Sequence, residues 1–379
     1  MIIGIDGNEA NVEKKVGVSE FAFELLKVFA SKKIPHIQFV VYLKHSPGKD
    51  LPGENNYFSH KVFGPSRLWT QIALPFHLFT QQPVPDVFFT PSHYVPRFCP
   101  SPIVMSIMDL SYLKFPELFK AKDLHQLVHW TKYSVSHVER IFTISESSKH
   151  DIIETYHVPD DRVVVTYPGF TMPVASKSLP PFEELVKKYD ISRNFILSVG
   201  TLQPRKNFVR LIEAFSLLIH EKNQKFTDLE LVIIGKKGWL YEEILTAPKR
   251  YDVENKVKFL DFVADSDLSS FYRHALCFTL PSLYEGFGLP VLEAMAYKCP
   301  VVVSQVSSLP EIADKAGIYV DPESVKSIEE GLMTCLKELE SAGGKKRVEL
   351  GLDQVKKFTW EKAAKQTLAI LEQLGGKTV

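Results

Sequence analysis

Short apolar runs alternate with longer segments of helical periodicity along the chain, and this alternation constrains the fold more than any other sequence feature. In the first half the strand-like runs are Ile2–Ile5, Phe39–Leu43, Asp86–Phe89, Ile103–Ile107, Arg140–Ile144 and Val163–Thr166. Helical patterns fall between them, at Val18–Ala30, Arg67–Phe79, Ala121–His137 and Glu146–Tyr156. Such alternation predicts a mostly parallel sheet with helices on both faces.

The same pattern starts again in the second half, after a segment rich in proline between residues 168 and 181. The second set of strand-like runs is Phe195–Val199, Leu229–Ile234, Val257–Leu260, Leu276–Leu280, Val301–Ser304 and Gly317–Val320. We therefore expect an α/β protein with two Rossmann-like domains facing a central cleft, at residues 1–170 and 191–355. A linker at 171–190 would join them, and a C-terminal helix would occupy 356–379.

Composition excludes several classes of protein. Lys+Arg and Asp+Glu both number 45 among 379 residues, and this balance argues against a nucleic-acid partner. The four cysteines form no CxxC pair and have no histidine at zinc-ligand spacing, which indicates reduced structural thiols. The first residues already form a strand-like run, and no apolar run approaches the roughly 20 residues of a membrane span. We expect a cytoplasmic protein.

The loop in segment 281–296 is the strongest chemical signal, because it joins a strand-like run to a helical pattern and contains Gly286 and Gly288. Helix N-termini attract anions, and glycine lets a ligand approach the backbone closely. Glu285 and Glu293 lie on either side of this loop, and carboxylates accept hydrogen bonds from vicinal hydroxyls. Alternatively, Glu293 only offsets the helix dipole and the glycines only make a tight turn.

A second loop of this kind holds Gly200, Arg205 and Lys206, and Asn207 is the expected N-cap of the helix that follows. The dipole disfavours cations at a helix N-terminus, so this placement indicates a bound anion. Arg and Lys are the usual partners of phosphate. The alternative is that both are solvated surface charges.

Together the two loops resemble the donor site of the retaining glycosyltransferases of family 4 (glycosyl transferases group 1), which have the GT-B fold. The resemblance covers nearly the whole chain and is nearest to a bacterial mannosyltransferase-like branch. Glu285 and Glu293 match the Glu-x7-Glu element of the family, and Gly200, Arg205 and Lys206 match its diphosphate-binding loop. The resemblance implies that Glu293 holds the ribose hydroxyls. It also implies contacts to the donor sugar and phosphate from Glu285, Gly286, Phe287, Gly288 and Leu289, with Glu285 in a catalytic role.

The first half matches the family less fully. Gly17 falls where the family has a glycine loop near the phosphates, or is only a helix-start glycine. Ser145 falls where hydroxyls line the cleft, or is only an N-cap. Asp109 is the catalytic candidate that binds or polarises the acceptor hydroxyl, or else it caps a loop. Met108 stands where the family often has histidine, and this difference argues against a mechanism in which a histidine acts at this position.

Two further residues, His93 and Tyr94, follow the preceding strand-like run and are candidates to line an acceptor pocket. Asp265 and Asp267 match the Asp-x-Asp metal motif of other glycosyltransferases. Because they lie at the start of a helical pattern, we expect them to cap that helix and offset its dipole. We therefore expect no metal and no cofactor, because cations and helix ends stabilise a departing diphosphate.

The predicted function is retaining transfer of a hexose, mannose or glucose, from a GDP- or UDP-sugar to a glycan or lipid-linked glycan. The rivals are a nucleotide-sugar epimerase or a phosphorylase of the same fold, and a non-catalytic nucleotide-sugar or glycan binder. A dinucleotide oxidoreductase is disfavoured because no GxGxxG follows a strand. The helix Leu124–His137, with Trp130 and Tyr133, is either a peripheral membrane contact or an ordinary helix with an aromatic face.

Overall fold

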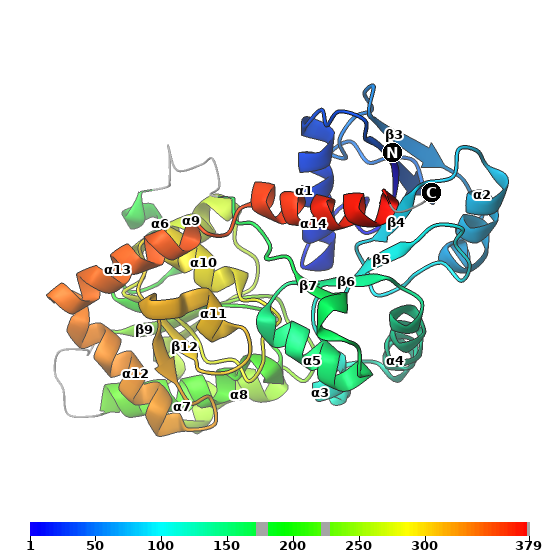
Figure 1. Ribbon diagram of the computed structural model, residues 1–379. Coiled ribbons are helices and arrows are strands. Elements are labelled where there is room, and N and C mark those ends of the chain that lie inside the picture. Colours follow the sequence, from blue (N-terminus) through cyan, green and yellow to red (C-terminus); the bar gives the residue numbers. More distant parts are fainter. Residues whose placement is uncertain (172–180, 221–227, 377–379) are drawn as a thin grey trace. The chain divides into compact units, whose positions relative to one another are not determined.

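The computed structural model describes residues 1–171, 181–220 and 228–376, and the chain divides into two compact units (Figure 1). Unit 1 comprises Met1–Gly169 and Phe358–Val379, and unit 2 comprises Phe170–Lys357. No helix within the described ranges is both long enough and apolar enough to cross a bilayer.

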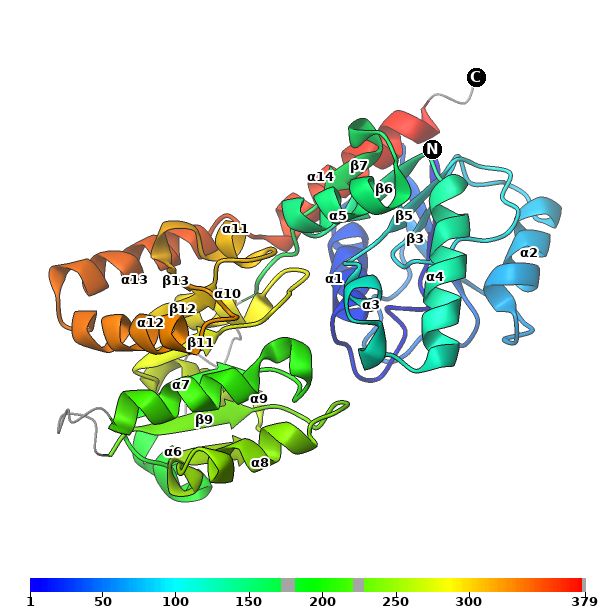
Figure 2. The ribbon, with the colours of Figure 1, turned by 90° about the horizontal axis from the view of Figure 1, so that it is seen from below.

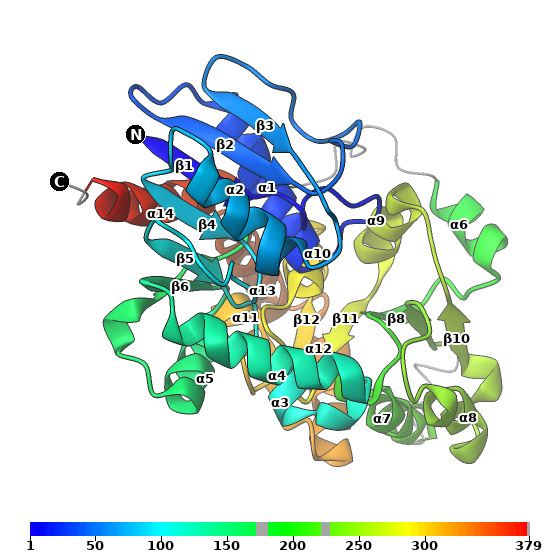
Figure 3. The same cartoon turned by 90° about the vertical axis from the view of Figure 1, so that its right-hand side faces the viewer.

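Unit 1 is built on a parallel sheet with the strand order β3-β2-β1-β4-β5-β6-β7 (Figure 3). The strands are β1 Ile2–Asp6, β2 Gln38–Leu43, β3 Phe58–Val62, β4 Val87–Thr90, β5 Ile103–Ser106, β6 Arg140–Thr143 and β7 Val163–Val165. The order reverses between β1 and β4, and ligands of such sheets bind beyond the carboxyl ends of the strands at this switch point. The unpredicted strand β3 lies at the sheet edge, where His60 and Lys61 interrupt its apolar pattern.

Helices cover the sheet of unit 1. They are α1 Val18–Ser31, η1 Trp69–Ala73, α2 Leu74–Thr80, α3 Ser111–Lys114, η2 Pro116–Leu118, α4 Ala121–Ser136, α5 Glu146–Tyr156, η3 Asp160–Arg162 and α14 Trp360–Gly375. α1 packs against α14, and Phe29 of α1 stacks on Phe39 of β2 with ring centroids 4.9 Å apart. α2, α4 and α5 contribute to a separate apolar cluster that includes Leu78, Val135 and Ile152.

Unit 2 has a second parallel sheet with the order β10-β9-β8-β11-β12-β13. Its strands are β8 Phe195–Val199, β9 Glu230–Ile234, β10 Val257–Leu260, β11 Cys277–Leu280, β12 Val301–Ser304 and β13 Ile318–Val320. Since all are parallel, the loops after β8, β11 and β12, neighbours in the sheet, lie at the same edge. This arrangement brings the two loops predicted from the sequence together.

The helices of unit 2 are α6 Phe182–Tyr189, α7 Phe208–His220, α8 Glu242–Arg250, α9 Asp265–His274, α10 Leu289–Ala296, α11 Leu309–Ala313, α12 Val325–Glu338 and α13 Ala342–Val355. Short turns of 3-10 helix are η5 Pro204–Lys206, η7 Glu254–Lys256 and η8 Asp314–Ala316. α7 and α12 lie side by side and share an apolar core that contains Phe215 and Leu332 (Figure 2).

The predicted linker and the predicted C-terminal helix both differ from expectation in where they pack. Within the predicted linker 171–190, residues 172–180 lie outside the described residues, and α6 packs against α9 of unit 2. The C-terminal helix α14 belongs to unit 1, where Trp360 packs against Phe21 with ring centroids 6.0 Å apart. Its pattern was visible in the sequence, but its packing partner in the first half of the chain was not.

Candidate active site

The loop between β11 and α10 is held in place by serines at the end of β12 and immediately after it. The Ser304 hydroxyl donates to the Ser282 carbonyl at 2.5 Å, and Ser308 donates to the carbonyls of Glu285 and Phe287 at 2.9 and 2.7 Å. Ser307 accepts from the backbone N–H of Glu285 at 2.9 Å. The loop is therefore fixed before any ligand arrives, by residues that carried no signal in the sequence.

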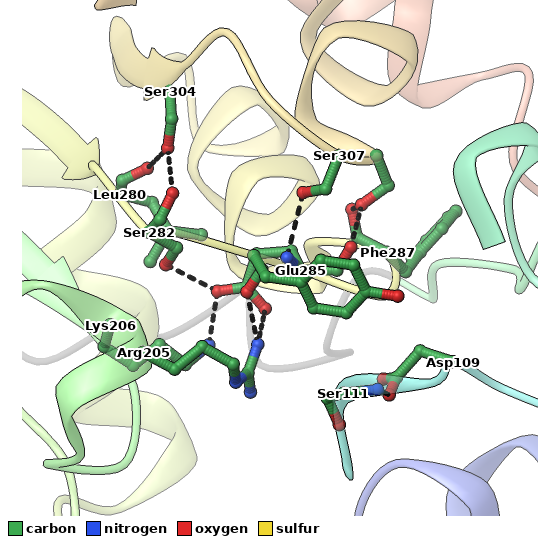
Figure 4. A network of polar contacts seen from close by, with 12 residues as sticks. Asp109, Ser111, Arg205, Lys206, Leu280, Ser282, Glu285, Phe287, Ser304 and Ser307 are labelled. Atoms are coloured by element: carbon green, nitrogen blue, oxygen red, sulfur yellow. Dashed lines mark hydrogen bonds and ion pairs between the residues drawn. The ribbon is translucent and has the colours of Figure 1, made fainter. Parts of the chain in front are cut away.

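Glu285 joins the two loops predicted from the sequence into a single charged cluster (Figure 4). Its Oε1 accepts from Lys206 Nζ and from the Ser282 hydroxyl, both at 2.6 Å, and its Oε2 accepts from Arg205 at 3.1 Å. Arg205 also donates to the Tyr284 carbonyl at 2.5 Å. We call Arg205, Lys206 and Glu285 the charged cluster.

The electrostatics of the charged cluster follow from its burial. Burial by itself raises the pKa of Glu285, but Lys206 and then Arg205 outweigh it and lower the pKa to about 2. The Glu285 side chain is only 7% exposed, so its charge is paired almost entirely inside the protein. Two cations and one carboxylate leave a local net charge of +1, which suits an anionic ligand.

Asn207 and Gly200 shape the loop that presents the two cations. Asn207 precedes α7, and its backbone carbonyl accepts from Leu211, as expected at a helix start. Its side-chain amide donates to the carbonyls of Pro281 and Pro322 at 2.9 and 2.6 Å, so it ties three loops together. A Cβ on Gly200 would lie 3.2 Å from Lys206 Cε, so glycine leaves room for the lysine stem.

The start of α10 carries the rest of the predicted donor site. Gly288 precedes the helix with φ 113°, a conformation that favours glycine, and Leu289 is the first helical residue. Among the described residues no side chain caps this N-terminus. Gly286 and Phe287 lie in the fixed loop immediately before it, so the structure brings together every predicted position from 285 to 289.

Glu293 lies one turn inside α10, as the sequence predicted, and is partly exposed. Its Oε2 accepts from the Tyr272 hydroxyl of α9 at 2.6 Å. Burial raises the pKa of Glu293, and the hydrogen bond from Tyr272 opposes this shift. Tyr272 was missed because its own helix shows no motif, although it fixes one oxygen of the carboxylate.

Gly17, Asp109 and Ser145 are among the predicted site residues that lie in unit 1. Gly17 precedes α1 with φ 57° and ψ −118°, so backbone conformation alone requires glycine there. Asp109 is partly exposed, and its Oδ1 accepts from the backbone N–H of Ser111 at 2.8 Å (Figure 4). Asp109 is therefore at least a cap of the turn into α3.

Ser145 corrects the prediction of a cleft-lining hydroxyl. The residue is fully buried, and its Oγ accepts from the backbone N–H of Ser148 at 3.0 Å. It also donates to the Ser148 hydroxyl at 2.9 Å. Ser145 is thus the N-cap of α5, the alternative that the sequence had left open.

The Asp-x-Asp segment differs from expectation in part. Both aspartates lie in the first turn of α9, where carboxylates offset the helix dipole, but the N-cap is Ala264 and no side chain in the described part of the chain caps this helix. Asp267 is buried and accepts from Lys188 Nζ and the Tyr189 hydroxyl, both at 2.6 Å, so the N-cap prediction was wrong. No cluster of three metal-ligating side chains occurs among the residues that the structure describes.

The helix proposed for membrane contact, α4, has its aromatic side chains engaged within unit 1. Trp130 packs edge-on against Tyr94 with ring centroids 5.4 Å apart, and the Tyr133 hydroxyl donates to the Arg97 carbonyl at 2.8 Å. His93, near Tyr94, has a buried Nδ1 without a hydrogen-bond partner in the described ranges. Burial lowers the pKa of His93 to about 4, against an opposing effect of Asp109.

Comparison with known proteins places these features in a family context. Residues 181–349 match the family described as "Glycosyl transferases group 1". The O-antigen chain mannosyltransferase B of Escherichia coli is 31% identical over 283 residues, which cover 74% of this chain and 73% of that protein.

Solved structures agree on the fold. Sucrose-phosphate synthase from Thermosynechococcus elongatus has a TM-score of 0.72 at 16% identity and covers 100% of both chains. Anabaena HepE in complex with UDP and glucose has a TM-score of 0.70 at 18% identity, covering 98% of this chain and 99% of that one.

Proposed function

The chain belongs to the group 1 glycosyltransferases with the GT-B fold, and on that premise we propose a retaining transfer of a hexose, mannose or glucose. The proposed donor is a GDP- or UDP-sugar, and the proposed acceptor is a glycan or lipid-linked glycan. The mannosyltransferase relative supports mannose as the transferred sugar, and the UDP and glucose bound by HepE support a nucleotide-sugar donor. The charged cluster beside the start of α10 carries the proposal.

The charged cluster supplies what departure of a nucleoside diphosphate requires. Negative charge grows on the diphosphate as the bond to the sugar breaks, so fixed cations stabilise the transition state more than the ground state. Arg205 and Lys206 are held by Glu285 and need no rearrangement to meet that charge. The N–H groups at the start of α10 add a partial positive charge. We propose that no metal is needed and that transfer persists in excess EDTA.

Retention is proposed to proceed on one face of the sugar. Both oxygens of Glu285 accept hydrogen bonds, and a carboxylate whose pKa is about 2 is a poor nucleophile, so Glu285 positions the cations instead. In the proposed step the acceptor oxygen bonds to the anomeric carbon while the carbon–oxygen bond to the diphosphate breaks. The proton of the acceptor hydroxyl passes to the departing phosphate oxygen.

Calorimetric titration with GDP and UDP tests the diphosphate assignment. Arg205→Ala and Lys206→Ala should each weaken binding about 10- to 100-fold, since a hydrogen bond to a charged group contributes roughly 1.5–3 kcal/mol. Arg250→Ala and Lys258→Ala are matched controls in unit 2, because they remove cations from exposed ion pairs with Glu243 and Asp190. Unchanged affinity in both cluster variants would exclude the assignment.

Glu293 is proposed to accept hydrogen bonds from the two ribose hydroxyls. Glu293→Gln should then lower affinity for GDP or UDP more than for the 2′-deoxy nucleotides, by about tenfold. Tyr272→Phe should give a smaller change in the same direction, because Tyr272 orients the carboxylate. If the preference for ribose survives both substitutions, Glu293 has a structural role only.

A further inference from the structure

Unit 1 contains a pocket of about 340 Å³ at the carboxyl ends of β1, β2 and β4. Its lining includes Asp6, Asn8 and Glu9 from the loop after β1, Trp69 of η1, Tyr94 after β4, and Trp130 of α4. Pockets of roughly 300–1,000 Å³ are the size that holds small organic ligands. We call this space the aromatic pocket.

Three aromatic side chains, Trp69, Tyr94 and Trp130, form part of the wall of the aromatic pocket, whose other lining residues are mostly polar. Tyr94 and Trp130 meet edge to face at 5.4 Å and 76°, and both are partly exposed. Trp69 is buried, and its Nε1 donates to the Phe63 carbonyl at 2.9 Å, which fixes the indole. Rigid aromatic rings offer large apolar contact at low entropic cost, and the C–H faces of a pyranose ring are apolar while its edge is polar.

The floor of the aromatic pocket accepts hydrogen bonds. Asp6 Oδ1 accepts from the backbone N–H and the side-chain amide of Asn8, at 3.0 and 2.6 Å. Asp6 Oδ2 makes no hydrogen bond with any residue in the described ranges, although Asp6 is only 7% exposed. This oxygen is accessible from the pocket, where a ligand hydroxyl can donate a hydrogen bond to it.

Charge selects the kind of ligand. The charged lining residues of the aromatic pocket are Asp6, Glu9 and Lys44, which together give a net charge of −1. That balance disfavours phosphate and carboxylate ligands, in contrast to the net +1 of the charged cluster in unit 2. A neutral ligand with many hydroxyls and apolar ring faces fits the lining.

A second chamber of about 190 Å³ adjoins the aromatic pocket, and Gln71, Tyr94 and Trp130 line both. In this chamber the Arg97 guanidinium lies over the Tyr133 ring at 5.0 Å, and its Nε donates to Gln71 at 3.2 Å. The two chambers thus share the Tyr94–Trp130 pair as a common wall, and we call the two together the groove. Two adjoining chambers offer room for more than one sugar ring.

We propose that this groove binds the acceptor as a neutral glycan of at least two sugar units, with the terminal sugar beside Asp6 and Trp130. The proposal rests on the proposed transferase function and names the substrate class of its acceptor side. The preceding sugar lies in the second chamber against Tyr94 and Arg97. Asp6 and Glu9 accept hydrogen bonds from hydroxyls of the terminal sugar, and their charge disfavours a phosphate on that sugar.

Fluorine NMR with 5-fluorotryptophan tests the groove directly. The chain has four tryptophans, at 69, 130, 239 and 360, so each signal is assigned with a Trp→Phe variant. The probes are methyl α-mannoside, α-mannobiose, α-mannotriose and mannose 6-phosphate. We expect the Trp130 signal to move and the buried Trp360 signal to stay. The disaccharide and trisaccharide should bind at least about tenfold more tightly than the monosaccharide, and the phosphate more weakly.

Three NMR outcomes would overturn the proposal. An unmoved Trp130 signal at saturating trisaccharide excludes binding in the groove. Movement of Trp239 alone would place the saccharide in unit 2. Equal affinity for the monosaccharide and the trisaccharide would exclude the second chamber.

Steady-state kinetics with α-mannotriose as acceptor distinguish a failure of the proposed acceptor groove from a failure of the proposed transferase activity. Trp130→Ala, Trp130→Phe and Asp6→Asn should raise the acceptor KM at least about tenfold while the donor Kd stays unchanged. Phe76→Ala, an exposed aromatic residue on α2 of the same unit, is the matched control. Transfer with normal acceptor KM in all three variants would refute the groove but keep the transferase. Saccharide binding at Trp130 without any transfer from GDP- or UDP-sugars would refute the transferase but keep the groove.

Discussion

The charged cluster of unit 2 and the aromatic pocket of unit 1 both lie at the carboxyl ends of parallel strands, but their polar atoms are used differently. In the charged cluster, both oxygens of Glu285 already accept hydrogen bonds from Arg205, Lys206 and Ser282. In the aromatic pocket, one oxygen of Asp6 accepts from Asn8 and the other has no partner in the described ranges. The first arrangement is complete without a ligand, and the second is completed by one.

This difference teaches what each site is built to recognise. A diphosphate leaving group needs charges fixed in advance, because reorganisation during the reaction would cost part of the stabilisation. A site for a neutral sugar needs unpaired hydrogen-bond acceptors at the edge of an apolar surface. A ligand that lacks the matching hydroxyls leaves these acceptors unpaired and is therefore bound more weakly. The opposite net charges of the two sites, +1 and −1, follow the same division.

Glu285→Gln should have the largest effect of any single change. It removes the carboxylate that pairs with buried Lys206 and partly exposed Arg205, so the free energy of unfolding should fall by about 3 kcal/mol. The transfer rate should fall on the order of 10³-fold, because the cations lose the partner that positions them. Urea denaturation and initial rates are measured together, with Glu243→Gln, the exposed partner of Arg250, as control. Normal stability and rate would mean that the charged cluster is dispensable.

Asp109→Asn should lower the transfer rate on the order of 100-fold and leave donor affinity unchanged. The amide oxygen keeps the hydrogen bond from Ser111 N–H, so the turn before α3 survives while the charged carboxylate that would bind and polarise the acceptor hydroxyl is lost. Asp86→Asn is the matched control, because Asp86 accepts from the backbone N–H of Ile2 in the same unit. A normal rate would reduce Asp109 to a turn cap, and a loss of donor affinity would place it in the donor site.

Glu285 in unit 2 and Asp6 in unit 1 should change the free energy of unfolding with pH in opposite directions. The pKa of Glu285 is lowered to about 2, so its stabilising contribution is present above pH 4.5 and is lost as pH falls from 4.5 towards 2. Burial raises the pKa of Asp6 to about 6, so the folded state holds this proton more tightly and loses stability as pH rises from 3.8 to 6. Each shift corresponds to about 3 kcal/mol at most.

Hydrogen exchange of amides, resolved for each unit between pH 3 and 7, measures these slopes. Glu285→Gln should remove a rising contribution to the pH slope of unit 2, and Asp6→Asn should remove a falling contribution to that of unit 1. An unchanged pH slope in either variant would contradict the environment assigned to its carboxylate.

Ser145→Ala should have the smallest effect, a loss of about 1 kcal/mol in the free energy of unfolding, as expected for an N-cap. Ser324→Ala is its counterpart in unit 2, since Ser324 accepts from the N–H of Ser327 at 3.1 Å at the start of α12. Both variants should keep donor affinity. A tenfold loss of donor affinity in Ser145→Ala alone would restore the ligand-binding role that its burial argues against.

The sequence was most informative where a chemical group and its support are close along the chain. Apolar runs predicted the strands of both sheets, and only β3 was missed, because an edge strand tolerates polar residues. Glu285 and Glu293 were found because a strand, a glycine loop and a helix follow one another within a few residues. Arg205 and Lys206 were found in the same way after β8.

Long-range partners were not predictable. Ser304, Ser307 and Ser308 hold the active-site loop from a separate segment, and serine is too common to stand out. Asp267 resembled a cap in sequence, yet its partners Lys188 and Tyr189 come from α6. The aromatic pocket draws on five separate segments, so its tryptophans and carboxylates share no local pattern.

The chain passes between the units twice, after Gly169 and before Phe358, and this path determines the order in which the protein is completed during translation. Unit 2 is one uninterrupted stretch, whereas unit 1 receives α14 from the far end of the chain. A Cβ on Gly169 would lie 2.1 Å from Trp360 N, so the two ends of unit 1 fit closely together. Domains fold largely as units while the ribosome extends the chain. The unit that emerges first is therefore finished only after the whole of unit 2 has been synthesised.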